Sequence, residues 1–133
     1  MQWTDGDYAG FSHHEPWIGL SEDSKGICAE NQINDEDSIF AYFKSLVKLR
    51  KENPVIADGS IEFMYSERED IFCYRRSLEG REMIVLCNLT ADTVSGDFAS
   101  HLAGMSRLMG NYPDSSVHSG GELRPYEAVV YQN

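Results

Sequence analysis

The sequence has few of the features that mark nucleic-acid-binding, membrane and secreted proteins. Its 133 residues contain 11 Lys and Arg against 22 Asp and Glu, so the net charge is −11. Phosphate backbones and anionic lipid surfaces bind through Lys and Arg, so we expect no nucleic acid and no membrane as partners. No apolar run approaches the roughly 20 residues of a membrane-spanning helix, and no basic start followed by an apolar stretch predicts a signal peptide. These absences favour a cytoplasmic location.

Motifs for metals and cofactors are also scarce. The three cysteines, Cys28, Cys73 and Cys87, are odd in number and lack the spacing of metal ligands, so reduced thiols are the simplest interpretation. His13 and His14 are adjacent, and neighbouring side chains of an extended segment point in opposite directions. The sequence contains no glycine-rich phosphate-binding pattern. We therefore predict no cofactor and no metal site.

The first 32 residues show no sustained period and predict an irregular loop. They begin MQWTDGDYAGF, in which aromatic residues stand among glycines and acids. These aromatics have two interpretations that the sequence leaves open. They stack on the apolar faces of sugar rings, or they pack the loop against a neighbouring surface. The residues concerned are Trp3, Tyr8, Phe11 and Trp17.

A single amphipathic helix follows, and its spacing predicts residues 35–52. Asn34 or Asp35 is expected to cap its start, with Glu36 and Asp37 in the first turn, where the helix dipole favours negative charge. Pro54 is expected to stop it. One wide apolar face includes Ile39, Phe43 and Leu46, together with neighbouring apolar residues. This face must pack on the rest of the chain, on another copy or on a surface absent from the chain.

The remainder of the chain reads as β structure. Clear strands are predicted at residues 61–65, 71–74, 83–89 and 128–131, with weaker ones near 93–98, 105–109 and 123. In the first strand Ile61, Phe63 and Tyr65 are expected to share one face. Residues 78–81 suit a short hairpin in which Gly80 has a positive φ. Several short strands separated by turns predict an antiparallel β-sandwich or barrel.

Acidic pairs are frequent, yet none predicts a catalytic site. Glycoside hydrolysis requires two carboxyl groups at a set separation. The candidate groups all lie in polar loops, where solvated charge is the simpler interpretation. These groups are Asp5 with Asp7, Glu22 with Asp23, and Glu67 with Glu69 and Asp70.

Several strings, taken in order along almost the whole chain, resemble α-glucosidases of glycoside hydrolase family 13. This group includes oligo-1,6-glucosidases, dextran glucosidases and trehalose-6-phosphate hydrolases. MQW, AGF and PWI resemble the segment after the last barrel strand, and QINDEDSI and LVKLRKENPV resemble the entry and exit of the eighth barrel helix. IFCYRR, IVLCNLT and LRPYEAVVY are similar to strands of the C-terminal β domain.

The resemblance implies a division of the chain and a parent enzyme. Residues 1–53 would be a remnant of the (β/α)8 catalytic barrel, its last loop and last helix. Residues 54–133 would be the C-terminal antiparallel β-sandwich domain, so the chain is mainly β. The parent would hydrolyse α-glucosidic bonds of short oligosaccharides by a retaining mechanism. Met1 would then stand at a cut edge of a longer protein.

The resemblance also sets expectations for individual residues. None of the family's catalytic carboxylate motifs is present, so we assign no catalytic residue and expect the chain alone to be inactive, with a role in stabilising the barrel. Gln2, Trp3 and Asp5 would lie near the substrate in the parent. Thr4 stands where the family usually has an Asp directly after MQW, which leaves the exact substrate open.

Partners follow from the same resemblance, and two alternatives remain. The expected partner is the catalytic barrel of the parent, through which alone the chain would meet an oligosaccharide. Without the barrel, self-association through Ile39, Phe43 and Leu46 is expected. The alternatives are a carbohydrate-binding module that uses Trp3 and Trp17, and a stand-alone interaction module.

Overall fold

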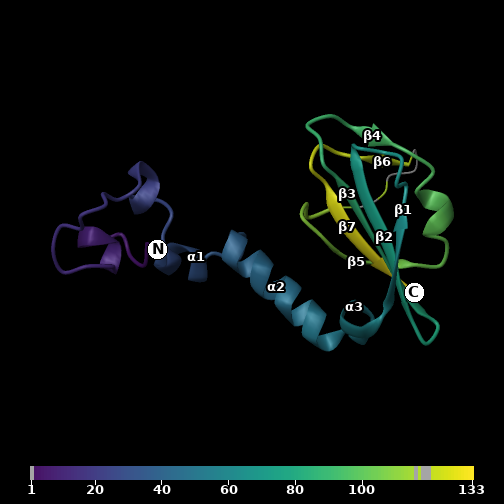
Figure 1. Ribbon diagram of the computed structural model, residues 1–133, viewed down its shortest axis with the longest axis horizontal. Coiled ribbons are helices and arrows are strands. Elements are labelled where there is room, and N and C mark those ends of the chain that lie inside the picture. The colour runs from purple at the N-terminus through teal and green to yellow at the C-terminus, as the bar shows by residue number, and fades with distance from the viewer. Residues whose placement is uncertain (1, 116, 118–120) are drawn as a thin grey trace. The chain divides into compact units, whose positions relative to one another are not determined.

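The chain forms two units, which are described separately (Figure 1). The computed structural model describes residues 2–115, 117 and 121–133. Met1, the first letter of the MQW string, lies outside them. The first unit comprises the residues up to Leu49, and the second comprises Arg50–Asn133. The sequence predicts this division four residues later, between residues 53 and 54.

The first unit is built from short helical pieces and one long helix. Two 3-10 turns, η1 (Asp7–Gly10) and η2 (Glu22–Lys25), precede the short helix α1 (Ala29–Ile33). Helix α2 (Ile39–Glu52) follows and continues for three residues into the second unit. The sequence therefore predicts this helix and its last residue correctly.

The start of α2 differs from the prediction. Ser38, not Asn34 or Asp35, caps the helix, because its hydroxyl accepts a hydrogen bond of 3.1 Å from the Ala41 N–H. Asp35 instead accepts a bond from the Asp37 N–H in a turn ahead of the helix. Glu36 and Asp37 consequently lie before the first helical turn. A hydroxyl at position 38 satisfies a free amide, so the helix begins four residues later than predicted.

The second unit is a mostly antiparallel β structure. Its main sheet has the order β1-β2-β3-β7-β5, and every neighbouring pair is antiparallel. The strands are β1 (Ser60–Met64), β2 (Ile71–Leu78), β3 (Arg81–Asn88), β7 (Ala128–Gln132) and β5 (Ser106–Gly110). A second sheet pairs β4 (Val94–Ser95) with β6 (Glu122–Leu123), and the turn η3 (Ala99–His101) lies between β4 and β5. Each strand falls at or near a predicted position.

Strands β2 and β3 form a hairpin with the shortest connection in the sheet. Leu78 pairs with Arg81, so only Glu79 and Gly80 form the turn. Both have positive φ, 51° and 83°, as a type I′ turn requires. The hairpin predicted at residues 78–81 is therefore confirmed, and Glu79 joins Gly80 in the left-handed region.

Side chains from both sheets meet in one hydrophobic cluster. The main sheet contributes one of its two faces, β4 contributes Val94 and β6 contributes Leu123. Phe98, which lies between β4 and η3 in the sequence, is the largest fully buried side chain. The cluster is therefore enclosed by residues of the second unit. Its buried members are Ile71, Cys73, Ile84, Leu86, Val94, Phe98, Leu123, Val129 and Tyr131.

The prediction that Tyr65 shares one face with Ile61 and Phe63 is wrong. It follows the last residue of β1 and has a positive φ of 56°. Its ring turns to Phe98, with 5.5 Å between the ring centroids, and its hydroxyl donates to the Asp97 carbonyl. The pleat ends at Met64, so the alternation of faces does not extend to Tyr65.

The short helix α3 (Pro54–Asp58) was not predicted. Pro54 occupies one of the first helical positions, where its missing N–H costs nothing, so it starts α3 as well as ending α2. Val55 is fully buried. The Arg76 guanidinium of β2 donates to the carbonyls of Val55, at 3.0 Å, and Gly59, at 2.6 Å. These bonds attach α3 to the main sheet.

Candidate functional site

The aromatic loop at the start of the chain is closed by its own backbone. The N–H groups of Trp3 and Thr4 both donate to the Ala9 carbonyl, at 2.8 and 3.2 Å. Tyr8 and Ala9 have positive φ values of 51° and 55°, a conformation that costs energy for residues other than glycine. Gly10 continues the left-handed run at 64°. The loop is thus a strained, compact turn, and strained turns are frequent at ligand sites.

Hydrogen bonds join this loop to the start of α1. The Ala29 N–H donates to the Gln2 carbonyl at 2.9 Å, and the Glu30 N–H donates to the Trp3 carbonyl at 3.0 Å. These amides belong to the first helical turn, which has no acceptor of its own. The backbone of residues 2 and 3 therefore caps α1.

The three residues predicted to lie near substrate occupy different positions. Gln2 lines an apolar pocket, whereas Asp5 lines a second pocket with Tyr8 and Lys25. The Asp5 carboxylate accepts a hydrogen bond of 2.9 Å from the Asn31 side chain, so it also links the loop to α1. Trp3 is half-exposed. Gln2 and Asp5 thus line two different pockets.

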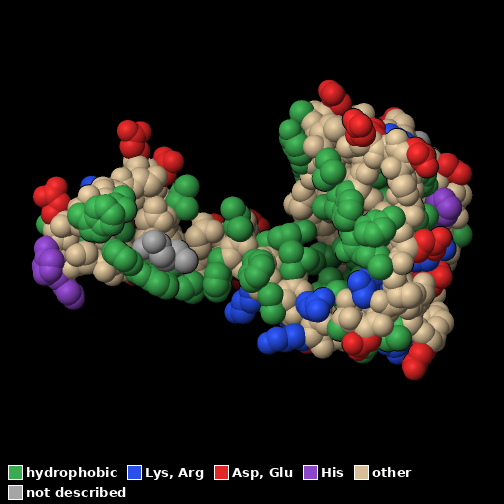
Figure 2. Space-filling model, viewed as in Figure 1, with side chains coloured by type: hydrophobic (Ala, Val, Ile, Leu, Met, Phe, Trp, Pro, Cys, Tyr) green, Lys and Arg blue, Asp and Glu red, His purple; other side chains and the backbone are tan. Residues whose placement is uncertain are grey.

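The apolar pocket is the strongest candidate for ligand contact in the first unit. It has a volume of about 340 Å3, and its walls come from residues 2, 11 and 16–21. Trp17 is 94% exposed and Phe11 is 65% exposed, so their rings are open to solvent at its wall. Hydrophobic side chains stand out on the surface of this unit in Figure 2. An exposed aromatic plane beside a shallow apolar pocket suits a ring-shaped ligand.

Two features of the described residues bear on catalysis, the possible metal ligands and the buried carboxylates. Within residues 2–115, 117 and 121–133, no three His, Cys, Asp or Glu side chains are placed to hold a metal ion. Among the same residues Glu127 is the buried carboxylate. Among the described residues, none of the helices is long and apolar enough to cross a membrane.

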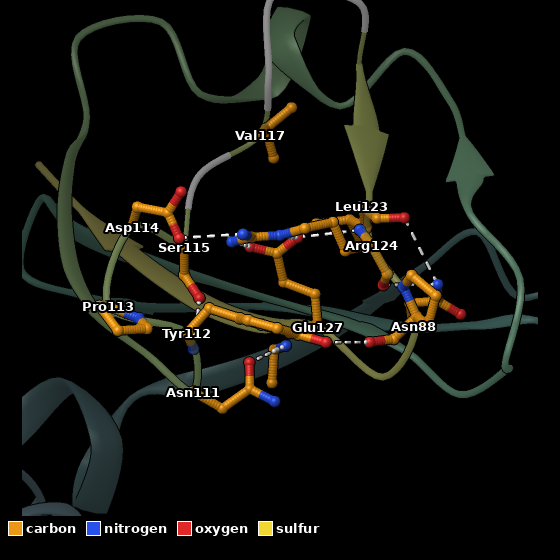
Figure 3. Close-up of polar contacts among 12 residues, drawn as sticks. Asn88, Asn111, Tyr112, Pro113, Asp114, Ser115, Val117, Leu123, Arg124 and Glu127 are labelled. Carbon is orange, nitrogen blue, oxygen red and sulfur yellow. Dashed lines mark hydrogen bonds and ion pairs between the residues drawn. The ribbon is translucent and has the colours of Figure 1, made fainter. Parts of the chain in front are cut away.

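The most extensive polar cluster lies in the second unit, around Arg124 (Figure 3). The guanidinium donates to both oxygens of Glu127, at 3.1 and 2.8 Å, and to Asp114 at 2.9 Å. It also lies over the Tyr112 ring, 4.1 Å from its centroid. Tyr112 donates through its hydroxyl to the Pro125 carbonyl. The cluster therefore connects the segment after β5 with the turn between β6 and β7.

Electrostatics show that Glu127 is ionised in the fold. Burial raises the pKa of Glu127, but hydrogen bonds from the Arg124 side chain and backbone outweigh burial, so the pKa lies below its usual value. The same bonds, with those to Asp114, raise the pKa of Arg124. Both Glu127 oxygens are occupied by Arg124. The pair is accordingly suited to structural support rather than to proton transfer.

Asn88 supports the same turn from β3. Its amide N–H2 donates to the carbonyls of Asp92, at 2.7 Å, and Arg124, at 2.8 Å. Its oxygen accepts from the backbone and hydroxyl of Thr90. Sequence reasoning missed this polar cluster. The available signal was the Arg124-to-Glu127 spacing of three residues inside the otherwise apolar end of the chain.

The cysteines of the sheet are unsuited to nucleophilic chemistry. Burial raises the pKa of the Cys73 thiol to about 12, with Cys87 adding to the shift. Burial also raises the pKa of Cys87. The thiolate is the reactive form, so a raised pKa makes both groups inert at neutral pH.

Comparison with known proteins yields a family and several relatives. Residues 1–59 match the catalytic domain of the α-amylase family. The chain is 35% identical to the probable oligo-1,6-glucosidase 3 of Bacillus subtilis, over 98% of the chain and 24% of that protein. It is 32% identical to the trehalose-6-phosphate hydrolase of Escherichia coli, over 97% of the chain and 24% of that protein.

Solved structures give the same result. The crystal structure of the trehalose-6-phosphate hydrolase of Bacillus licheniformis matches with a TM-score of 0.84 and 29% identity, over 98% of the chain and 24% of that structure. The trehalulose synthase of Pseudomonas mesoacidophila matches with a TM-score of 0.83 and 26% identity, over 98% and 24%. The chain thus spans about a quarter of the length of the relatives it matches.

Proposed function

The chain belongs to the α-amylase family, and we propose that it is the C-terminal part of an α-glucosidase. The whole enzyme would hydrolyse α-glucosidic bonds of short oligosaccharides by a retaining mechanism in the cytoplasm. One observation carries this proposal. Similarity to oligo-1,6-glucosidases extends over 98% of the chain, whereas the match to the catalytic domain of the family covers residues 1–59. The residues beyond this match would form a second domain, in addition to the catalytic domain.

We assign residues 1–53 to the end of the catalytic barrel and residues 54–133 to a C-terminal β-sandwich. The two sheets of the second unit support the sandwich. Val94 of β4 and Leu123 of β6 are buried in the same cluster as Ile84 and Leu86 of β3. Two sheets that share one core in this way form the basic arrangement of a sandwich.

The chain alone would stabilise the barrel without catalysing the reaction. Retaining glycosidases use two carboxyl groups about 5 Å apart, one of them a proton donor. The buried carboxylate of the described residues, Glu127, is held by Arg124 on both oxygens. This arrangement supports a structural role for the second unit.

A pair of assays tests the proposal. The purified chain is expected to give no turnover of isomaltose, maltose or an aryl α-glucoside. A chimera in which the chain replaces the matching quarter of the B. subtilis relative is expected to hydrolyse at least one of them. Turnover by the isolated chain would contradict the structural role. A folded but inactive chimera would contradict the parentage.

We assign the exposed face of α2 to contact with the rest of the barrel. Ile39 is 84% exposed and Phe43 64%, and Leu46 is also exposed. Apolar area of this kind marks a contact surface. In the isolated chain, the same residues would drive self-association. Sedimentation is expected to show concentration-dependent association, which Phe43→Lys should weaken and Lys44→Ala should not. A clean monomer at high concentration would contradict self-association.

The substrate-adjacent assignment of Gln2, Trp3 and Asp5 remains a prediction for the whole enzyme. Gln2 lines the apolar pocket, which supports its place near a sugar. In the chimera, Gln2→Ala is expected to raise the KM, whereas Gln32→Ala serves as the matched control. Equal KM values for the two variants would contradict the prediction that Gln2 lies near the substrate.

A second candidate function is direct binding of carbohydrate by the isolated chain. The exposed Trp17 at the apolar pocket favours it, because an aromatic plane stacks on the C–H face of a sugar ring. Titration with isomaltose should then shift the Trp fluorescence, and Trp17→Ala should abolish the shift. No shift at millimolar sugar would end this candidate.

A further inference from the structure

The sequence contains two Asp–Gly bonds, at residues 5–6 and 58–59, and the fold places them in different surroundings. An aspartate that precedes a glycine is chemically reactive, because no side chain shields the glycine nitrogen. That nitrogen attacks the aspartate Cγ and water leaves, which closes a succinimide ring. Water then opens the ring at either carbonyl and gives aspartate or isoaspartate. The reaction releases and takes up the same amount of water, so it needs no other reactant.

The Asp–Gly bond of the first unit is accessible. Asp5 and Gly6 are both exposed, in the loop just ahead of η1, which is the purple turn in Figure 1. The Gly6 N–H donates to a side chain, the Thr4 hydroxyl, at 3.2 Å. The same hydroxyl oxygen would lie 3.3 Å from a Cβ added to Gly6. Because side chains rotate more easily than packed backbone, rotation of Thr4 frees the Gly6 nitrogen for attack.

The Asp–Gly bond of the second unit is enclosed by backbone atoms. Gly59 is buried, although Asp58 is exposed. The Gly59 N–H donates to the Val55 carbonyl at 3.2 Å, at the end of α3. A Cβ added to Gly59 would lie 2.5 Å from the carbonyl oxygen of Val55 and 3.1 Å from that of Ser77. The Arg76 guanidinium also binds the Gly59 carbonyl. Attack by the Gly59 nitrogen therefore requires α3 to open from the main sheet.

We propose that Asp5 is a site of spontaneous isomerisation to isoaspartate, and that the fold protects Asp58 from the same reaction. The two sites share their local sequence chemistry, so the difference between them comes from the structure around each glycine nitrogen. The proposal concerns a covalent change in the loop. It is independent of the proposed parentage, and its tests use the isolated chain.

Isomerisation would change the closure of the loop. Isoaspartate carries the main chain through its Cβ, so it adds one methylene group between residues 5 and 6. This bond lies inside the ring that the Thr4 N–H closes on the Ala9 carbonyl. The carboxylate moves from Cβ to Cα, away from the position in which it accepts from the Asn31 side chain. We expect the product to lose the ring closure and this side-chain link to α1.

Ageing of the purified chain tests the site. The chain is incubated for weeks at slightly acidic pH, where more carboxyl groups are in the protonated, electrophilic form. Trypsin then releases Asp5 and Asp58 in separate peptides, because Lys25 and Lys51 lie between them. Labelling with a protein isoaspartate methyltransferase measures isoaspartate in each peptide. Isoaspartate is expected to form several-fold faster at Asp5, and an equal or faster rate at Asp58 would overturn the proposal.

Unfolding of the chain gives the reference rates. In concentrated urea the two Asp–Gly bonds should react at similar rates, because the protection of Asp58 is lost with the fold. An undiminished excess at Asp5 in urea would overturn the structural explanation.

A variant pair tests the attacking nitrogen. Gly6→Ala is expected to slow the reaction at Asp5 several-fold, because the added methyl group hinders attack by the nitrogen. Gly19→Ala is the matched control and should leave the rate unchanged, since no described atom lies within 4 Å of a Cβ added there. Equal rates at Asp5 in the two variants would overturn the assignment of the Gly6 nitrogen.

The aged product gives a readout of the loop itself. The isoaspartate form is separated by ion-exchange chromatography and compared with the fresh chain by NMR. The resonances of the Asn31 side-chain amide and of the Thr4 N–H are expected to shift, because each group loses its acceptor. Amides of β3 should not shift. Unshifted Asn31 and Thr4 resonances would overturn the expected opening of the loop.

Discussion

The two units of the chain differ in how many of their apolar side chains are buried. Arg50–Asn133 contains nearly all of the buried hydrophobic residues, whereas Ala9 and Cys28 are those of the first unit. Trp17, Ile39 and Phe43 of the first unit are more than half-exposed. The second unit therefore has a core of its own, whereas the first unit exposes much of its apolar surface.

The stability of each unit has a different source. An isolated helix of 14 residues, the length of α2, is marginal in water without tertiary contacts. The strands of the second unit are held by cross-strand pairs and by a shared core. We expect the second unit to unfold cooperatively. We expect the first unit to open locally, without unfolding of the second.

Amide hydrogen exchange should give the largest contrast. Amides of β3, at the centre of the main sheet, are expected to exchange only through global unfolding, at a cost of about 5 kcal/mol or more. Amides of α2 should exchange through local opening at nearly no cost. Equal protection of β3 and α2 would contradict this difference in stability between the units.

A pair of phenylalanine substitutions should separate the units next. Phe98→Ala removes the largest fully buried side chain and is expected to cost about 3–5 kcal/mol of the free energy of unfolding of the second unit. Phe43→Ala, at an exposed position of α2, should change the same quantity by no more than about 0.5 kcal/mol. Urea unfolding followed by far-UV circular dichroism measures both. Similar costs would show that α2 shares the core.

The ion pair of the second unit gives a smaller, pH-dependent effect. Glu127→Gln is expected to cost about 2 kcal/mol at pH 7, because Arg124 keeps its charge and loses a charged acceptor. The folded-state pKa of Glu127 lies below its ordinary value of 4.5, so its contribution is present above pH 4.5 and is lost as pH falls through the folded-state value. Urea unfolding at several pH values should show the deficit constant down to about pH 5 and shrinking below it. A deficit that grows on acidification would contradict the ionised state.

The N-cap of α2 gives the smallest expected effect. Ser38→Ala removes the acceptor of the Ala41 N–H and should destabilise α2 by about 1 kcal/mol, seen as a loss of helical circular dichroism. Ser45→Ala, inside the same helix, is the control and should leave the helical signal unchanged or raise it. A loss of helical signal in the Ser45 variant alone would contradict the assignment of Ser38 as the N-cap.

The sequence predicts elements better than it predicts their ends and their polar supports. Periodicity locates α2 and the longer strands because side-chain burial follows the helical and strand repeats. It misplaces the start of α2, because Asn34, Asp35 and Ser38 are all good caps and only the fold selects one. It misses α3, which is a single short turn that accepts a hydrogen bond from Arg76, twenty-one residues away in the sequence from Val55.

The candidate site was predictable only in part. Gln2 and Asp5 were identified through a family resemblance, and the structure places them in separate pockets. The Arg124 cluster depends on partners in three segments of the chain, Asp114, Asn88 and Glu127, and no local pattern brings these together. Contacts of this kind are set by tertiary structure, so spacing along the sequence does not reveal them.

The tight hairpin of β2 and β3 also fixes an order of events during folding. Its turn has two residues, so closing it requires little loop entropy and can occur within microseconds. Strand β7 pairs with β3 only after the chain has travelled from Asn88 to Ala128, so the pairing is non-local and slower. We expect the hairpin to be the template on which β7 assembles. During synthesis the hairpin would emerge first. Strand β3 would then lack its β7 partner until Ala128–Gln132 had been synthesised.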